Sequence, residues 1–156
     1  MEVDAPGRLE DSRSSEETVA GVRERRSNLH STLVDLEQAI ASAAPRRTAE
    51  WRHAVHTALE RLATRFADHV ASTEGPGGLF ESVRQRAPRL DHACRRLKEE
   101  HAEIQSKIAA ARRRLDDDPE SVRDAAMSLL TLLARHRQRG ADLVYEAYDV
   151  DLGGSD

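Results

Sequence analysis

The sequence predicts an all-α protein, an up-down-up-down antiparallel four-helix bundle, on the strength of its composition and its apolar spacing. Only 3% of the 156 residues are aromatic, and Ala, Leu, Arg and Glu dominate, which favours helix throughout. Apolar residues recur at helical intervals in four segments separated by short breaks, as in bundles of this kind. With 38% hydrophobic residues the chain has material for one core. We therefore expect one bundle domain over residues 15–149, between an arm (1–14) and a tail (150–156).

The first helix follows a polar N-terminal segment. Residues 1–14 carry too few apolar side chains to fold by themselves, so we expect them to be disordered. Ser14 followed by Glu17 has the spacing of a capping box, and Pro45 ends the helix that starts there. Its apolar face consists of Val19, Val22, Leu29, Leu33, Leu36 and Ile40.

The second helix begins at Thr48, a suitable capping residue, and ends at "GPGG", residues 75–78. Its apolar face consists of Val55, Leu59, Leu62, Phe66 and Val70. A short turn of helix around "LFESV", residues 79–83, then leads to Pro88. This segment connects the two halves of the predicted bundle.

The third and fourth helices complete the bundle. The third follows Pro88, and its apolar line consists of Leu90, Cys94, Leu97, Ile104, Ile108 and Leu115. Asp118 is a good N-cap for the fourth helix, and Pro119 suits the first helical position. This helix runs to about Tyr148, with Val122, Ala126, Leu129, Leu133, Leu143 and Ala147 on one face.

Charge and hydropathy exclude several classes of partner. The net charge of −4 mixes Arg with Asp and Glu along the chain, so there is no basic face typical of a nucleic-acid-binding protein. No segment approaches 18 consecutive apolar residues, and the N-terminus lacks a signal-peptide pattern, so we expect a cytoplasmic protein without a membrane segment. The single cysteine, Cys94, cannot form an internal disulfide and is expected to be a small buried thiol without chemistry.

One of the seven histidines occupies a position where an apolar residue is expected. His101 lies on the apolar line of its helix, between Leu97 and Ile104. At about 100° per residue, each of the other three helices also directs one histidine inward. The inward set consists of His30, His69, His101 and His136, and the expected surface set of His53, His56 and His92.

The depth of these histidines along their helices is similar. Depth is measured from the end of the bundle where the first helix connects to the second and the third to the fourth. At about 1.5 Å per residue from that end, His30 and His101 lie about 21 Å deep. On the same scale His136 lies about 26 Å deep and His69 about 30 Å deep. Each could be an ordinary hydrogen-bonded core residue, but four unpaired imidazoles would cost roughly 1 to 3 kcal/mol each. A metal ion would satisfy them together, and imidazole suits iron, zinc, copper and nickel.

No motif in the chain points to catalysis. The Glu-x-x-His pattern of ferritin-like bundles occurs once, at Glu50 and His53, on the outward face of its helix. The sequence has no glycine-rich phosphate loop, no HExxH, no paired-cysteine site and no arrangement typical of a Ser/His/Asp nucleophile. We therefore do not expect an enzyme.

Four stretches of the chain resemble one protein family. They are "NLHSTLVDLEQAI", "FADHVASTEGPGGLFESV", "APRLDHACRRLKEEHAEI" and "LLARHRQRGADLVYEAYDVDLGG". In their order and spacing they are similar to the bacterial hemerythrin-like, or HHE cation-binding, domain proteins, over nearly the whole chain from about residue 25.

The resemblance implies a bundle that holds a non-heme di-iron centre with histidine and carboxylate ligands. Members of the family bind oxygen, sense oxygen, nitric oxide or redox state, or handle iron. Carried over position by position, the metal ligands are His30, His69, Glu74, His101 and His136. The implied function is a metal-binding module that senses or stores rather than catalyses.

This chain departs from the family at two positions. The family has a carboxylate four residues after the ligand histidine of the second helix and of the fourth, where this chain has Thr73 and Gly140. Glu74 and Glu37 are candidate substitutes. Three outcomes are open: two irons completed by such substitutes, one metal ion on a histidine-rich site, or a metal-free bundle that binds another protein.

Overall fold

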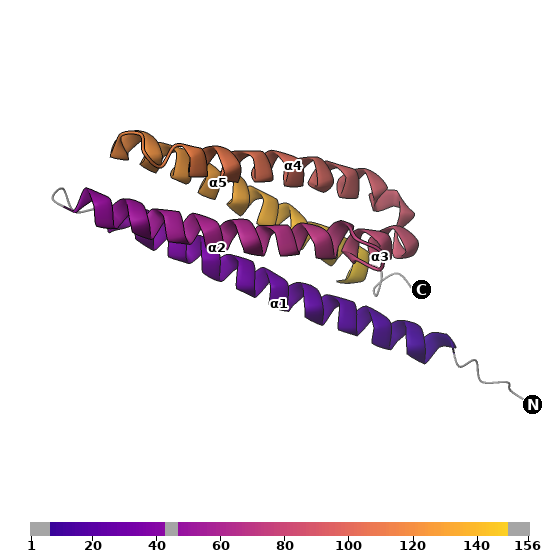
Figure 1. The fold of residues 1–156 in the computed structure, drawn as a ribbon. Coiled ribbons are helices and arrows are strands. Elements are labelled where there is room, and N and C mark those ends of the chain that lie inside the picture. Colours follow the sequence, from indigo (N-terminus) through magenta and orange to yellow (C-terminus); the bar gives the residue numbers. More distant parts are fainter. Residues whose placement is uncertain (1–6, 43–46, 150–156) are drawn as a thin grey trace, which may run out of the picture.

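The computed structural model describes residues 7–42 and 47–149, which are all-helical and contain no strand (Figure 1). No helix in these ranges combines the length and apolar character needed to cross a membrane. The helices are α1 (Gly7–Ala41), α2 (Thr48–Glu74), α3 (Leu79–Arg86), α4 (Asp91–Arg113) and α5 (Pro119–Val144). A 3₁₀ turn, η1 (Pro88–Leu90), precedes α4, and a π-helical turn, η2 (Tyr145–Asp149), follows α5.

The four long helices α1, α2, α4 and α5 lie side by side, and each packs against two of the others (Figure 1). α1 contacts α2 and α5, while α4 contacts the same two helices from the other side. This closed ring of contacts is compatible with the expected bundle. The prediction of an all-α fold is confirmed.

Two helix boundaries differ from the prediction. α1 begins at Gly7, so the part of the expected arm from residue 7 to residue 14 is helical. Residues 8–14, "RLEDSRS", contain no proline or glycine, so nothing in them stops a helix from extending toward the N-terminus. The rest of the arm and the tail 150–156 lie outside the described residues. The expected turn around residues 79–83 is a helix of eight residues, α3.

The buried apolar residues form two separate clusters. The larger, the main core, runs between the four long helices and includes Leu36, Val55, Leu62, Phe66, Ile104, Leu129 and Leu133. The smaller, the α3 core, includes Leu79, Phe80, Val83, Cys94, Leu97, Leu143 and Ala147. Along α4 and α5, a buried histidine lies between the residues of one cluster and those of the other. The predicted burial of Cys94 is confirmed.

The glycine-rich turn after α2 positions α3 against the bundle. Gly77 has φ of +70°, a conformation that favours glycine. A Cβ at Gly78 would lie 2.6 Å from the carbonyl oxygen of Ser72, too close for any side chain. The tight turn lets Phe80 stack on the ring of His101, with 5.6 Å between ring centroids. The turn that ends α2 thus also places one wall of the histidine layer.

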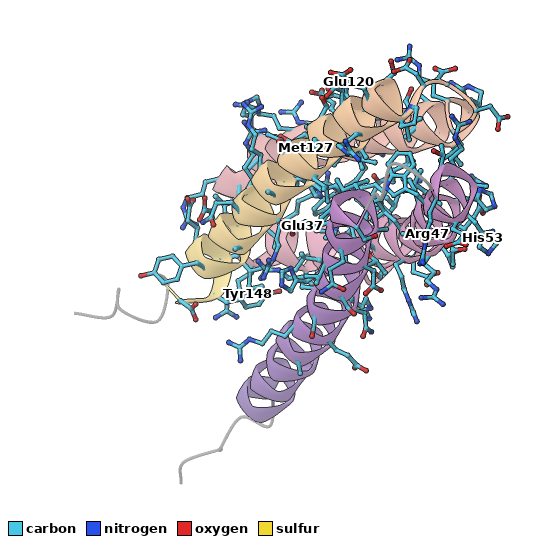
Figure 2. All side chains as sticks on the ribbon, turned by 90° about the vertical axis from the view of Figure 1, so that its left-hand side faces the viewer. Glu37, Arg47, His53, Glu120, Met127 and Tyr148 are labelled. Carbon is cyan, nitrogen blue, oxygen red and sulfur yellow. The ribbon has the colours of Figure 1, made fainter. Side chains whose placement is uncertain are left out.

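We predict that Leu62→Ala lowers the free energy of unfolding by about 2 to 5 kcal/mol, because Leu62 is fully buried in the main core. Met127→Ala is the matched control, since the Met127 side chain is 56% exposed (Figure 2). Urea denaturation followed by circular dichroism measures both. Equal effects of the two substitutions would contradict the placement of the core.

Candidate metal centre

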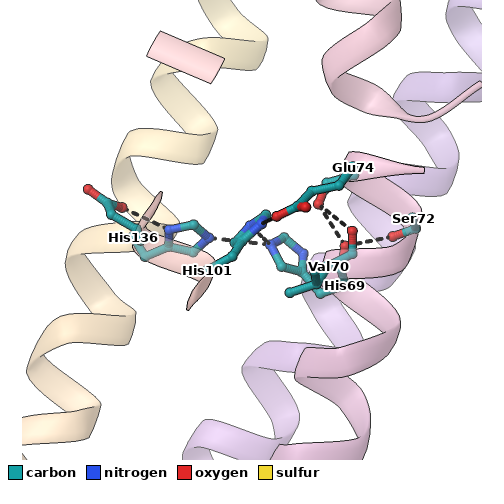
Figure 3. A network of polar contacts seen from close by, with 8 residues as sticks. His69, Val70, Ser72, Glu74, His101 and His136 are labelled. Carbon is teal, nitrogen blue, oxygen red and sulfur yellow. Dashed lines mark hydrogen bonds and ion pairs between the residues drawn. The ribbon is translucent and has the colours of Figure 1, made fainter. Parts of the chain in front are cut away.

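Three of the predicted histidines meet in the interior, one each from α2, α4 and α5 (Figure 3). The Nε2 atom of His69 lies 3.2 Å from that of His101 and 3.3 Å from that of His136. The ligand atoms of all three lie within 4.8 Å of one another. Two nitrogens bound tetrahedrally to one metal at about 2.0 to 2.1 Å would be about 3.3 Å apart. The two shorter separations therefore match those of ligands to a single ion.

Two of these rings form hydrogen bonds with carboxylates through Nδ1, on the side of the ring away from the converging Nε2 atoms. The Nδ1–H of His101 donates to Glu74 Oε1 at 2.7 Å, and that of His136 donates to Glu100 Oε2 at 2.8 Å. Arg139 donates to the other oxygen of Glu100. Because an ionised carboxylate only accepts, each Nδ1 carries the proton and each Nε2 presents a lone pair. This pairing of carboxylate with imidazole orients metal-binding histidines in many proteins.

The charge state of the rings follows from their burial. Burial, and repulsion from neighbouring His101 and His136, lower the pKa of His69 to about 3. Burial and the proximity of His136 lower the pKa of His101 to about 3, and burial also lowers that of His136, against the opposing effect of Glu100. The three imidazoles are thus neutral at pH 7.

Too few protons are present to satisfy the three facing nitrogens. His101 and His136 carry their protons on Nδ1, so only the Nε2 of His69 can hold one between them. A single N–H cannot donate at full strength to two acceptors in different directions. A cation with vacant coordination positions satisfies all three lone pairs, so the donor set fits one metal ion.

The surroundings exclude water from most of the cluster. The Phe66 ring lies 5.5 to 6.0 Å from all three imidazole rings, and Phe80 covers His101 from the other side. Burial tends to raise the pKa of Glu100, but hydrogen bonds from His136 and Arg139 outweigh this effect and lower it. Glu100 therefore stays ionised beside neutral rings, which favours the Nδ1–H tautomer of His136.

Glu74 lies at the cluster but not among the converging nitrogens. It is the last residue of α2, and its carboxylate reaches His101 without unwinding of that helix. Its contact is with Nδ1, on the opposite side of the ring from Nε2. The structure thus places Glu74 where it orients the His101 ring, and not among the atoms that converge as candidate metal ligands.

His30 and Glu37 lie outside the cluster. The His30 side chain is exposed, contrary to the expected inward position, and its Nδ1 lies 2.8 Å from Arg137 Nη1. It sits at the edge of the α1 apolar stripe, where a small rotation of the helix decides between core and surface. Glu37 is exposed on the same side of α1 (Figure 2). The three histidines predicted to be on the surface, His53, His56 and His92, are exposed.

Thr73 and Gly140, the two departures from the family pattern, both border a cavity of about 40 Å³ beside His69 and His136. The Thr73 hydroxyl is used within its helix, where it donates to the His69 carbonyl oxygen at 2.8 Å. In the part of the chain that the structure describes, no carboxylate joins the group of converging ligand atoms. The residues present therefore fit one metal ion and do not fit a carboxylate-bridged pair.

Sequence reasoning missed Glu100 and Arg139. Glu100 is three residues after Leu97 and four before Ile104, so the spacing that marked His101 as buried applies to it as well. Its charge concealed this signal, because carboxylates are seldom buried without a partner. Arg139 is an exposed residue of α5, and no apolar spacing on that helix marks it.

Comparison of the chain with protein-family models, with curated proteins and with solved structures gave no match.

We predict that the metal-free protein loses stability on acidification between pH 7.5 and 5.5. Unfolding raises the pKa of His69 and His101 from about 3 to about 6.5, so the unfolded chain takes up protons that the folded chain refuses. This contribution to stability is complete above pH 6.5 and declines as the pH falls toward 3. We expect the free energy of unfolding to fall by about 1 to 3 kcal/mol between pH 7.5 and 5.5, measured by urea denaturation in the presence of a chelator.

His101→Leu should show a smaller loss over the same interval, because it removes one of the two rings and completes the apolar line of α4. His92→Gln, at an exposed position of the same helix, is the control and should behave as the unmodified chain. Equal pH dependence in His101→Leu and the unmodified chain would contradict the assignment of neutral buried imidazoles.

Proposed function

We propose that this chain is a hemerythrin-like metal-binding module, an up-down-up-down antiparallel bundle that holds a single iron ion at His69, His101 and His136. We propose that it senses or binds dioxygen or nitric oxide rather than catalysing a reaction. One observation carries the proposal: three neutral imidazole nitrogens, those of buried His101 and His136 and of half-buried His69, face one another with at most one proton among them. The three imidazoles suit iron, zinc, copper and nickel alike. The family resemblance is the reason for proposing iron.

The residues around the ligands have separate tasks. Glu74 and Glu100 fix the tautomers of His101 and His136 and set the direction of their Nε2 lone pairs. Phe66 and Phe80 keep water from the rings, which strengthens electrostatic interactions in the layer. A bound iron ion would supply a redox-active centre with coordination positions free for a small ligand. The cavity beside His69 and His136 has room for such a ligand.

A single ion is proposed in place of two because the described residues lack bridging carboxylates. Glu74 and Glu100 are engaged on the far side of the rings, and Glu37 is on the surface. The two carboxylates behind the rings balance the charge of one divalent ion, and a second ion would have no further carboxylate at the cluster to balance it. The donor set thus supports one metal ion in preference to a pair.

We predict about one iron per chain in untagged protein expressed in iron-supplemented medium, measured by elemental analysis. His101→Leu should lose the metal, whereas His30→Leu should retain it, because the His30 side chain is exposed and directed at Arg137. Loss in both variants, with about two irons in the unmodified chain and near-ultraviolet absorption of an oxo-bridged pair, would show that the di-iron alternative is correct. Absence of any metal, with an unchanged fold, would favour the metal-free interaction module.

We predict that Glu100→Ala weakens metal binding by about 10- to 100-fold, since it frees the His136 ring to rotate and to change tautomer. Competition with a chromophoric chelator measures the affinity. Glu99→Ala is the matched control, because Glu99 is the adjacent residue and its side chain is exposed. Similar affinities in the two variants would mean that the carboxylate does not position a ligand.

A further inference from the structure

Glu100 links two of the helices that supply the converging histidines. It lies on α4 directly before His101, and its Oε2 accepts the Nδ1–H of His136 on α5 at 2.8 Å. Its Oε1 accepts a hydrogen bond from Arg139, which lies three residues after His136 on the same helix. Residues three apart share one face of a helix, so the ring and the guanidinium group meet the carboxylate together. Both oxygens of Glu100 are thus bound by α5.

The double contact restricts the orientation of the carboxylate. The terminal torsion of a glutamate side chain is broad, so a carboxylate held at one oxygen can still rotate, whereas contacts at both oxygens restrict its plane. The Arg139 side chain is 46% exposed and that of Glu100 only 11%, so the guanidinium group closes the buried carboxylate off from the surface. The carboxylate in turn directs the His136 ring, whose Nε2 lies 3.3 Å from that of His69. Arg139 therefore acts on the histidine layer through Glu100.

Different roles of Arg139 predict different effects on metal affinity. If only its charge mattered, the guanidinium group would repel a bound cation, and its removal would strengthen metal binding. If it anchors a group that orients a ligand, its removal would weaken metal binding, because partners behind metal-binding histidines contribute to affinity. A purely structural ion pair at this half-exposed position would leave the affinity unchanged and add little to stability. The sign of one measured quantity separates the three roles.

A second arginine at the same place provides a comparison. An open groove between α4 and α5 is lined by Arg96 and Arg139, with Glu100 between the two helices. Arg96 is exposed and lies four residues before Glu100 on α4. Among the described residues, Glu100 receives hydrogen bonds from His136 and Arg139 and none from Arg96. The groove therefore holds two similar charges, of which one makes the orienting contact.

We propose that Arg139 is a positioning residue of the metal centre, the outer member of the hydrogen-bonded series Arg139–Glu100–His136 that directs the Nε2 atom of His136 at the metal. This inference rests on the proposed metal site. Glu100 balances the charge of the guanidinium group and lies between it and the ring, so orientation outweighs repulsion of the ion. Because Glu100 is adjacent to His101, the series also fixes α4 and α5 relative to each other at the histidine layer.

The test measures the Co²⁺ affinity of the full chain by competition with a chromophoric chelator, together with the visible absorption of bound Co²⁺. Arg139→Met keeps most of the side-chain length but has no donor, and it should bind Co²⁺ about three- to tenfold more weakly with an altered spectrum. Arg139→Lys should recover most of this loss, because the contact uses a single N–H donor. Arg96→Met is the matched control and should not weaken binding.

A double variant shows whether Arg139 acts through Glu100. Glu100→Ala removes the middle of the series, so adding Arg139→Met to it should cause no further loss of Co²⁺ affinity. A loss by the same factor with and without Glu100 would reveal a direct effect of Arg139 and overturn the inference.

A measurement on the metal-free protein is independent of Co²⁺. Nitrogen-15 NMR reports which ring nitrogen of His136 carries the proton, and we expect Nδ1–H in the unmodified chain and a mixture of tautomers in Arg139→Met. An unchanged tautomer in that variant would overturn the inference. Urea denaturation of the metal-free protein should give similar midpoints for Arg139→Met and Arg96→Met. A lower midpoint for Arg139→Met alone, with an unchanged Co²⁺ spectrum, would show a purely structural role.

The outcomes keep this inference and the metal site apart. Failure of the unmodified chain to take up Co²⁺ would overturn the metal site and this inference with it. Uptake of Co²⁺ with unchanged or tighter binding in Arg139→Met would overturn the inference and leave the metal site standing.

Discussion

The mutual approach of three neutral imidazole nitrogens is the constraint around which the rest of the molecule is organised. It places three nitrogen lone-pair sites in a layer of low dielectric constant, where there are too few N–H donors to satisfy them. The apolar core cannot be continuous through this layer, and it divides into the main core and the α3 core. Two carboxylates are brought inside to direct the rings, and an arginine accompanies one of them. A bundle designed for stability alone would place leucines here, because an apolar layer needs no such network.

Helical periodicity was sufficient to predict the fold class and the three converging histidines. Each of His69, His101 and His136 lies on an apolar line whose neighbours are buried, so packing of the helices leaves their side chains no other direction. The boundaries of α2 and α5 were also close to prediction, because glycine, proline and a capping aspartate mark them. Local signals of this kind depend on the backbone and need no knowledge of neighbouring helices.

The parts that escaped prediction depend on contacts between helices. His30 lies at the edge of its apolar stripe, and only the packing of α1 against α5 decides that it faces outward. Glu100 was missed because its burial requires the His136 ring and the Arg139 guanidinium group, both on α5, and no pattern on α4 reveals them. The direction of Glu74 depends on where the glycine-rich turn ends α2. No spacing rule contains these relations, since they arise between side chains from different elements.

The short helix α3 has a consequence for kinetics. It holds Phe80 on the ring of His101 and Leu79 at the wall of the cavity, yet it is only eight residues long and follows a turn that glycine makes possible. Parts of a protein open locally at free energies below that of global unfolding, and a segment with fewer buried contacts opens at lower free energy. Opening of α3 alone would remove Phe80 from the His101 ring and Leu79 from the cavity wall while the long helices stay packed. The rate at which a bound ion leaves would then depend on this segment as well as on the ligands.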